Sequence, residues 1–295
     1  MSVEQETSSD RPLAPGLYLV ATPIGNLEDT TLRALRVLRN VDLIACEDTR
    51  QTQKLLNHFE IRTPTVSYHM HNEVVRAEEL TAKLKSGERI AVVSDAGTPG
   101  IADPGGQIAA AAIAAGIDVF PVPGANAAIS GLIASGLPTD RFTFHGFLPA
   151  KAGQRKTALE ELLRGEVTHV FYEAPHRILD TLADIEAVFG ISQHVVIARE
   201  LTKLHEEFLR GPVGDLRSQL AARASIRGEI VLMLAPCRAE ASSKTKKASL
   251  AVEVADLMKA EGIGEMDALK RVARERGIGK SEAYRELQRE QNRLR

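Results

Sequence analysis

The sequence predicts an α/β protein: two α/β domains followed by a small helical domain. Two observations lead to this fold class. From Leu17 to Leu234, short apolar runs alternate with segments of helical periodicity, which is the pattern of strands covered by helices on both faces of a sheet. Beyond residue 236 the strand-like runs stop and only short helical patterns follow. A length of 295 residues agrees with two or three domains.

The first α/β domain is expected to span residues 14–124, with a strand before each helical segment. The first helix would follow Asp29 or Thr30 as its N-cap. The predicted strands are Leu17–Ala21, Val41–Cys46, Thr65–Tyr68, Ile90–Ser94 and Val119–Val122, and the later predicted helices are Gln51–Phe59, Glu73–Ser86 and Gly106–Ala115.

The second α/β domain is expected to span residues 125–238, because the combined region is longer than one usual domain. The predicted helices are Ala127–Ser135, Lys156–Arg164 and Ile178–Phe189, and the predicted strands are Arg141–Phe147, His169–Tyr172, His194–Ala198 and Ile230–Leu234. No element is predicted between Ala198 and Ile230.

A third domain, residues 246–295, is predicted to be helical and helix-turn-helix-like. It follows a polar linker at 236–248, and its expected helices are Leu250–Lys259, Glu265–Arg276 and Ser281–Arg289. Residues 244–295 carry a net charge of +4, whereas the rest of the chain carries −6. This asymmetry indicates either contact with a polyanion, through Lys280 and Arg285, or simply a solvated helical face.

Composition indicates a cytoplasmic protein. No apolar run approaches the roughly 18 residues that a membrane span requires, and residues 1–11 are polar rather than signal-like. The cysteines, Cys46 and Cys237, lie in separate apolar runs, so neither a disulfide nor a cysteine metal site is expected.

Glycine and proline concentrate in three loops where predicted strands end. These loops are residues 22–26, 95–106 and 123–127, and the last two precede predicted helices. In α/β proteins, ligands bind at the carboxyl ends of strands, where tight glycine turns let a ligand approach the backbone. Each loop alone is an ordinary turn, but together the three predict one pocket.

Several common chemistries find no support in the sequence. No Gly-x-Gly-x-x-Gly motif follows a strand, and Gly279-Lys280-Ser281 lacks the P-loop glycine because position 274 is Arg274. No Gly-x-Ser-x-Gly turn is present. His69 and His71 have no third ligand at a recognisable spacing, so no metal is expected.

Four segments carry a recognisable pattern: Ala21-Thr22-Pro23-Ile24-Gly25-Asn26-Leu27, Cys46-Glu47-Asp48-Thr49-Arg50, Ser94-Asp95-Ala96-Gly97-Thr98-Pro99 and Glu229-Ile230-Val231-Leu232. They resemble the ribosomal RNA small subunit methyltransferase I family, within the tetrapyrrole-methylase superfamily. The resemblance extends from about Leu17 to Pro236, and the helical tail also matches. The resemblance implies S-adenosylmethionine bound between two α/β domains, a homodimer, and a cytidine ribose of small-subunit (16S) ribosomal RNA as target.

The resemblance also implies which positions contact the methyl donor. The residues that match the superfamily's donor-contacting loops and strand ends are Ser94, Asp95, Ala96, Gly97, Ile101, Asn126, Ala127, Phe171, Tyr172 and Leu201. One departure concerns the first loop. Tetrapyrrole methylases carry a Gly-x-Gly-x-Gly-Asp type sequence there, whereas this chain has residues 22–28, Thr-Pro-Ile-Gly-Asn-Leu-Glu, which favours an RNA substrate over a porphyrinoid one.

Polar clusters after the predicted strands supply candidates for catalysis, although each could also be a surface ion-pair cluster. Methyl transfer to a ribose oxygen requires alignment and removal of a weakly acidic proton. As base or orienting group we consider Asp48, His69 and Glu47. Arg50 and Arg177 are candidates for holding RNA phosphate.

Two other functions stay open at this stage. A methyltransferase for a tetrapyrrole or another small molecule would not need the basic tail. A non-enzymatic nucleic-acid-binding protein would use the tail and bind RNA or DNA in a salt-dependent way, without affinity for S-adenosylmethionine. The partner could be free ribosomal RNA or the assembled small ribosomal subunit.

Overall fold

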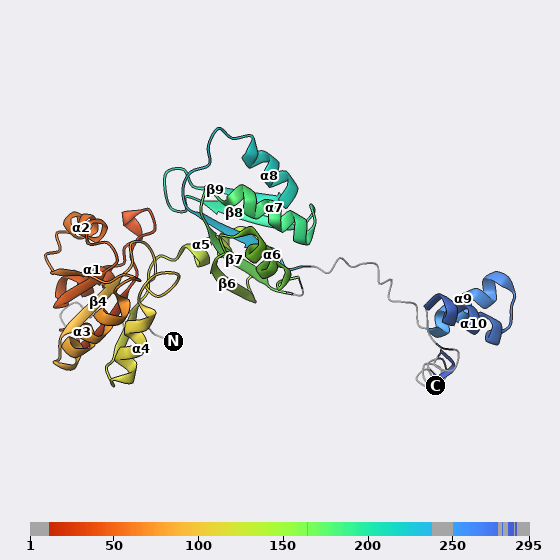
Figure 1. The fold of residues 1–295 in the computed structure, drawn as a ribbon, viewed down its shortest axis with the longest axis horizontal. Helices are drawn as coiled ribbons and strands as arrows, with labels where there is room; N and C mark the ends of the chain where they lie inside the picture. Colours follow the sequence, from red (N-terminus) through yellow and green to blue (C-terminus); the bar gives the residue numbers. More distant parts are fainter. Residues whose placement is uncertain are drawn as a thin grey trace, which may run out of the picture. The chain divides into compact units, whose positions relative to one another are not determined.

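The computed structural model describes residues 12–163, 165–237, 250–276, 279, 283–285 and 287. The chain divides into two compact units, Met1–Cys237 and Arg238–Arg295, each of which is described by itself. The first unit contains two five-stranded sheets with their helices (Figure 1). These sheets confirm the predicted α/β fold class. No helix in the described ranges has both the length and the apolar character needed to cross a membrane.

The first sheet is entirely parallel, in the order β3-β2-β4-β1-β5. Its strands are β1 (Gly16–Val20), β2 (Leu43–Cys46), β3 (Thr65–Ser67), β4 (Arg89–Val93) and β5 (Val119–Val122). Strands β4 and β1 are neighbours at the middle of the order. The connection after β1 leads to β2 on one side of this pair, and the connection after β4 leads to β5 on the other side. The neighbours β1 and β4 therefore define a topological switch point, where open α/β sheets leave a crevice outside the carboxyl ends of the strands.

Helices cover both faces of this sheet. On one face, α1 (Leu32–Asn40) and α2 (Thr49–His58) share a buried apolar cluster with alternate strand residues such as Ile44 and Val93. On the other face, α3 (Glu73–Lys85) and α4 (Gly106–Ala114) pack against the intervening residues. Because successive strand side chains point to opposite faces, β1, β2, β4 and β5 contribute to both clusters, whereas β3 contributes only Val66, to the second.

The start of α1 differs from the prediction that Asp29 or Thr30 caps it. The cap is Thr31, whose Oγ1 accepts a hydrogen bond from the Ala34 amide at 3.1 Å. Residues 27–29 instead form a short 3-10 turn, in which the Asn26 side chain accepts from the Glu28 amide. The 3-10 turn ends at Thr30, whose amide donates to the Leu27 carbonyl, and α1 begins only after it.

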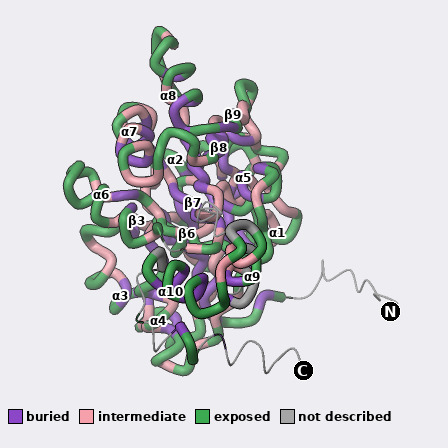
Figure 2. The backbone as a smooth tube through the Cα atoms, turned by 90° about the vertical axis from the view of Figure 1, so that its right-hand side faces the viewer, coloured by how far each residue is buried: buried purple, intermediate pink, exposed green. Residues whose placement is uncertain are grey.

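The second sheet is mixed, in the order β6-β7-β10-β8-β9. Its strands are β6 (Phe142–Phe147), β7 (Thr168–Glu173), β8 (His194–Arg199), β9 (Glu207–Pro212) and β10 (Ile230–Leu234). Only β6 and β7 are parallel, and the other neighbouring pairs are antiparallel. Strands β7 and β8 run through the buried part of the tube in Figure 2.

One face of this sheet is covered by α5 (Ala127–Ser135), and the other by α6 (Ala152–Glu160), α7 (Ile178–Phe189) and α8 (Val213–Ala221). The sequence prediction placed α6 four residues late and missed β9 and α8. Strand β9 lies at the sheet edge and has only two buried residues, so its apolar signal is weak.

The second unit contains α9 (Leu250–Glu261) and α10 (Glu265–Arg276), which confirm the first two helices predicted there. Their buried residues, including Leu250, Val254 and Leu269, form one apolar cluster with Ala283 and Leu287. Of the third predicted helix, Ser281–Arg289, the structure describes residues 283–285 and 287, all helical. The other positions of that helix, and Lys280 before it, lie outside the described residues.

Candidate functional site

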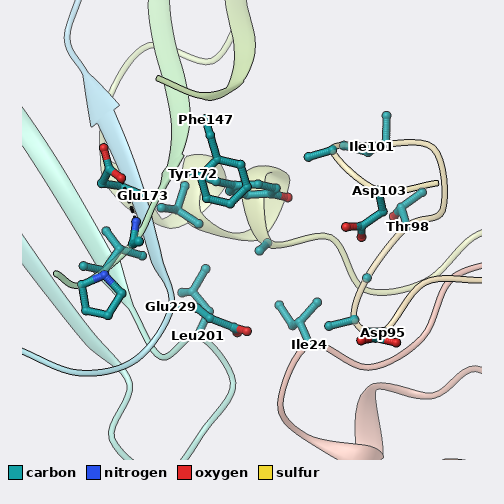
Figure 3. Close-up of a pocket in the computed structure, with 18 of the residues that line it drawn as sticks. Ile24, Asp95, Thr98, Ile101, Asp103, Phe147, Tyr172, Glu173, Leu201 and Glu229 are labelled. Carbon is teal, nitrogen blue, oxygen red and sulfur yellow. Dashed lines mark hydrogen bonds between the residues drawn. The ribbon is translucent and has the colours of Figure 1, made fainter. Parts of the chain in front are cut away.

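A cavity of about 430 Å³ lies at the switch point of the first sheet and continues to the ends of strands in the second (Figure 3). This volume is within the range typical of small-molecule sites. Its lining residues are Ile24, Glu47, Asp95, Ala96, Gly97, Thr98, Ile101, Ala102, Asp103, Ala127, Phe147, Tyr172, Glu173, Ala174, Pro175, Leu201, Glu229, Ile230 and Val231.

The loop that follows β4, residues 95–103, forms the wall on the side of the first sheet. Backbone hydrogen bonds in both directions join Thr22 to Gly97, at 2.8 and 3.1 Å. The Thr98 hydroxyl donates to the Ala125 carbonyl and accepts from the Asn126 amide, each at 3.2 Å. These contacts tie the three glycine- and proline-rich loops together, as their positions at strand ends predicted.

Glycine is required at position 97 for two reasons. Its φ of +85° lies in the left-handed region, which is unfavourable for residues with a Cβ. A Cβ there would also lie 3.3 Å from Ile24 Cγ2. A side chain at this position would therefore strain the loop and press on the neighbouring cavity wall.

Residues of the second sheet form the opposite wall of the cavity. They come from the carboxyl ends of some strands and the amino ends of others. Because β7 and β10 are antiparallel, the carboxyl end of one lies beside the amino end of the other, and Tyr172 pairs with Val231. The turn after β8 adds Leu201. Figure 3 shows Phe147, Tyr172 and Leu201 facing the side that carries Asp95, Ile101 and Asp103.

An aromatic group forms part of this wall. The Tyr172 ring contacts the Phe144 and Phe147 rings edge-on, with centroids 4.9 and 5.7 Å apart. Burial raises the pKa of the Tyr172 hydroxyl, so it stays protonated. The Phe147 side chain is exposed toward the cavity rim, where it offers a flat apolar surface.

The cavity is strongly acidic. Five carboxylate residues line it, and none of its lining residues is lysine or arginine. Glu173 is paired with Arg177 and Glu229 with Lys203. In the described part of the chain, Glu47, Asp95 and Asp103 have no such cationic partner.

Two of these unpaired groups have perturbed ionisation. Burial raises the pKa of Glu47, and the nearby Asp103, Asp95 and Asp48 raise it further. Burial also raises the pKa of Asp103, with Asp95 and Glu229 adding to the effect. A partly buried group of like charges is costly without a ligand, so the cavity is electrostatically suited to a cation.

Of the ten positions expected to contact the methyl donor, seven line this cavity. They are Asp95, Ala96, Gly97, Ile101, Ala127, Tyr172 and Leu201. Ser94 is buried just before the loop, and its carbonyl accepts from the Thr22 hydroxyl. Asn126 caps α5 and holds Thr98.

Phe171 lies in the core on the opposite face of the second sheet. It is completely buried among residues of α6, α7 and α8. The alternation of side chains along β7 sends Tyr172 toward the cavity and Phe171 away from it. Phe171 therefore acts on the cavity only through packing.

The three candidates for base or orienting group lie in different surroundings. Glu47 lines the cavity. The Asp48 carboxylate accepts two hydrogen bonds from the Arg50 side chain and one from its amide, and these contacts lower its pKa to about 2. His69 lies beside His71, with ring centroids 5.9 Å apart, and does not line the cavity.

The residues proposed to bind RNA have different surroundings where the structure describes them. Arg50 is 88% exposed and paired with Asp48. Arg177 donates to the carbonyls of Leu148 and Pro149 and forms an ion pair with Glu173, so its guanidinium ties β7 to the segment after β6. Arg285 is exposed in the C-terminal unit, and Lys280 is outside the described residues.

Sequence reasoning missed several lining residues, notably Thr98, Asp103, Phe147 and Glu229. Thr98 and Asp103 lie in a loop already singled out for its glycines, and their side chains carried no separate signal. Glu229 directly precedes β10 rather than following a strand. Site residues were expected at the carboxyl ends of strands, whereas Glu229 reaches the cavity at the amino end of β10, which is antiparallel to β7. Within the described ranges, no three His, Cys, Asp or Glu side chains are grouped to hold a metal ion.

Comparison with known proteins places this fold and site in a family. The family model of the Tetrapyrrole (Corrin/Porphyrin) Methylases matches residues 16–217. A solved structure of uroporphyrin-III C-methyltransferase from Thermus thermophilus, complexed with S-adenyl homocysteine, has a TM-score of 0.52 and 18% identity, covering 75% of this chain and 97% of that one. The fold is thus that of the tetrapyrrole-methylase family.

Closer relatives define the branch of that family. "Ribosomal RNA small subunit methyltransferase I" of Halalkalibacterium halodurans is 48% identical over 95% of this chain and 97% of its own length. The protein of the same name from Synechocystis sp. is 47% identical over 91% and 95%. The chain belongs to the ribosomal RNA small subunit methyltransferase I family.

Proposed function

We propose that this protein transfers a methyl group from S-adenosylmethionine to the 2′-oxygen of a cytidine ribose in small-subunit (16S) ribosomal RNA. The observation that carries the proposal is the acid-lined cavity at the switch point, in a chain whose relatives are named for methyl transfer to ribosomal RNA. The choice of a cytidine 2′-oxygen rests on the family resemblance.

The residues of the cavity fit this donor. S-adenosylmethionine carries a sulfonium and an ammonium group, and the unpaired carboxylates of Glu47, Asp95 and Asp103 complement positive charge. Phe147 and Tyr172 offer aromatic surface to a planar adenine. When bound, the donor supplies an electrophilic methyl group, and its sulfonium charge makes a metal unnecessary for the reaction.

The protein contributes alignment, exclusion of water and a proton acceptor. Ile24, Leu201 and Val231 are buried apolar residues of the wall, and they keep solvent from the reacting groups. Alignment of the two reactants can lower the barrier by several kcal/mol. In the overall reaction, the ribose oxygen gains the methyl group, the donor sulfur keeps the pair of electrons of the broken bond, and the hydroxyl proton goes to the protein.

Glu47 is our first choice as the proton acceptor. Its raised pKa makes it a stronger base than Asp48, whose pKa is lowered to about 2 by Arg50. It also lines the cavity, unlike Asp48 and His69. A positioned base typically accelerates such a step by ~10²–10⁴-fold.

The protein is also proposed to act as a homodimer in the cytoplasm, on either the free RNA or the assembled small subunit. Exposed apolar residues on α5 and on the edge strand β6, among them Ile133 and Phe142, support self-association. Uncovered edge strands with large apolar side chains promote aggregation unless another surface covers them.

The test uses S-adenosylmethionine with a labelled methyl group. Small subunits and naked RNA from cells that lack the enzyme leave the target site free, and DNA and a tetrapyrrole serve as comparison acceptors. We expect label in an alkali-resistant RNA dinucleotide, because a methylated 2′-oxygen blocks cleavage. Donor binding without label in any RNA would overturn the RNA assignment, and label in the tetrapyrrole would replace it.

A further inference from the structure

A second cavity, of about 450 Å³, lies next to the acidic one. Its lining residues are Thr22, Pro23, Ile24, Gly25, Leu27, Gln51, Lys54, Leu55, Asp95, Ala96, Lys203 and Glu229. Ile24, Asp95, Ala96 and Glu229 also line the first cavity, so these four residues form a shared wall. A methyl acceptor must lie beside the donor, and the four shared residues place the two cavities side by side.

The two cavities differ in charge. Lys54 and Lys203 are the cationic residues among the described lining residues of the second cavity, and the first has none. The Lys203 ammonium is held by Glu200 at 2.8 Å and Glu229 at 3.0 Å, so its charge is balanced by protein groups. A cationic donor suits the first cavity, and an anionic group suits the side of the second where Lys54 lies.

Lys54 is exposed on α2 and is the better placed of the two lysines to bind an anion. Its ammonium donates to the neutral Gln51 side chain at 2.9 Å. Among the described residues it forms no ion pair with a carboxylate. A lysine with a neutral partner can bind phosphate without first breaking a salt bridge.

The part of this cavity's lining that Gly25 and Lys203 form is closely packed. Lys203 belongs to the part of the first unit that carries the second sheet, and Gly25 lies in the loop after β1. The Lys203 stem passes so close to Gly25 that a Cβ at position 25 would overlap it. The Lys203 ammonium is fixed by Glu200 and Glu229 beyond that contact. The Lys203 stem thus packs against the loop after β1 next to Glu229, a residue of the shared wall.

We propose that the second cavity holds the target ribonucleotide, unstacked from its RNA strand, with its ribose toward the shared wall and Lys54 on a backbone phosphate. This inference rests on the proposed function and adds the place where the acceptor binds. A nucleotide in a polymer must enter through an opening that also lets the strand continue outside, and an exposed lysine at that opening suits the strand's phosphates.

The first test compares Lys54→Gln with Lys85→Gln. Lys85 is an exposed lysine on α3 that lines neither cavity, so it controls for loss of one positive charge. The readouts are steady-state methyl transfer to unmodified small subunits at several salt concentrations, and donor affinity by calorimetry.

We expect Lys54→Gln to raise KM for the acceptor about 5-fold and to reduce the slope of log affinity against log salt by about 0.7–0.9, the value of one phosphate contact. The donor Kd should stay within about 2-fold of the unmodified protein. Lys85→Gln should change neither parameter. Equal behaviour of the two variants would overturn the placement of the phosphate.

A second test blocks the cavity sterically. Gln51 lines the second cavity, whereas Gln53, also exposed on α2, lines neither cavity. Gln51→Trp should lower kcat/KM for the small subunit at least about 10-fold with an unchanged donor Kd, and Gln53→Trp should remain active. Full activity of Gln51→Trp would overturn this inference while leaving the proposed function intact. A parent protein that binds the donor but labels no RNA would instead overturn the proposed function, and this inference with it.

Discussion

The first unit has two α/β halves, one with the sheet of β1–β5 and the other with the sheet of β6–β10. They use their ionisable residues differently. Among the described residues, the buried charged side chains of the first unit, Arg155, Glu173 and Asp184, all belong to the second half, where each has a partner. In the first half, the carboxylates of Glu47, Asp95 and Asp103 line the cavity without a cationic partner. The comparison indicates that the buried charges of the second half are paired within the protein, whereas three cavity carboxylates of the first half are available to a cationic ligand.

The largest expected effect tests the structural role of charge in the second half. Arg155 donates to Asp184 at 2.7 Å, and both side chains are at least 90% buried. Arg155→Ala should lower the free energy of unfolding by about 3–5 kcal/mol, because it leaves a buried carboxylate without its main partner. Urea denaturation measures this. Lys156→Ala, which removes an exposed lysine 3.5 Å from Asp184, should cost less than about 1 kcal/mol. Equal losses of unfolding free energy in the two variants would contradict a stabilising role for the buried Arg155–Asp184 pair.

The next effect tests the catalytic role of charge in the first half. Glu47→Gln should lower kcat at least ~100-fold, because it removes the proposed base. Its fold should be unaffected or slightly stabilised, since burial and neighbouring carboxylates disfavour the ionised Glu47. Asp48→Asn is the matched control, with an expected loss in kcat below about 3-fold. Single-turnover methyl transfer distinguishes the two, and a larger loss for Asp48→Asn would move the base to that residue.

A smaller effect concerns donor affinity. Asp103→Asn keeps the size of the side chain but removes a carboxylate whose pKa is raised by burial and by Asp95 and Glu229. We expect the donor Kd to rise about 10-fold, or about 1.4 kcal/mol, while the melting temperature rises because repulsion is relieved. Calorimetry and thermal denaturation give the two values. Donor binding as tight as in the unmodified protein would show that the acidic character of the cavity serves another purpose.

The smallest effect is a pH dependence in the second half. His169 is 4% exposed and lies 2.9 Å from His145, and burial, with a contribution from His145, lowers its pKa to about 4. Since the unfolded value is about 6.5, the unfolded state binds more protons between these values. The stability contributed by neutral His169 is complete above pH 6.5 and is lost as the pH falls toward 4.

We therefore expect the free energy of unfolding to drop by about 1 kcal/mol from this group between pH 7.5 and 5.5. Raised carboxyl pKa values act in the opposite direction, so Glu47 and Asp103 stabilise the fold as the pH falls through their range. His169→Leu should reduce the drop in urea midpoints between these pH values. An unchanged pH profile in this variant would exclude His169 as its source.

Sequence patterns predicted most of the first half because its strands are parallel and their ends coincide. All five strands there were found, and the loops after β1, β4 and β5 do meet at one place. The second half was predicted less completely. Strand β9 and α8 were missed, and Glu229 reaches the cavity only because β10 runs against β7. Strand direction is a long-range property that local periodicity does not contain.

The sequence by itself determined the fold class and the loops that carry the cavity, because these depend on hydrophobic periodicity and on glycine and proline at fixed places, and four of its segments resembled those of the family. Only the tertiary structure decided which side chains face the cavity. The Tyr172 side chain faces the cavity, whereas Phe171 lies in the core on the other face of the sheet. The Arg177 guanidinium donates to a backbone carbonyl. The tertiary structure also placed Lys203 beside Gly25. Such outcomes depend on packing between segments far apart in the chain, where a residue's type is known but its neighbours are not.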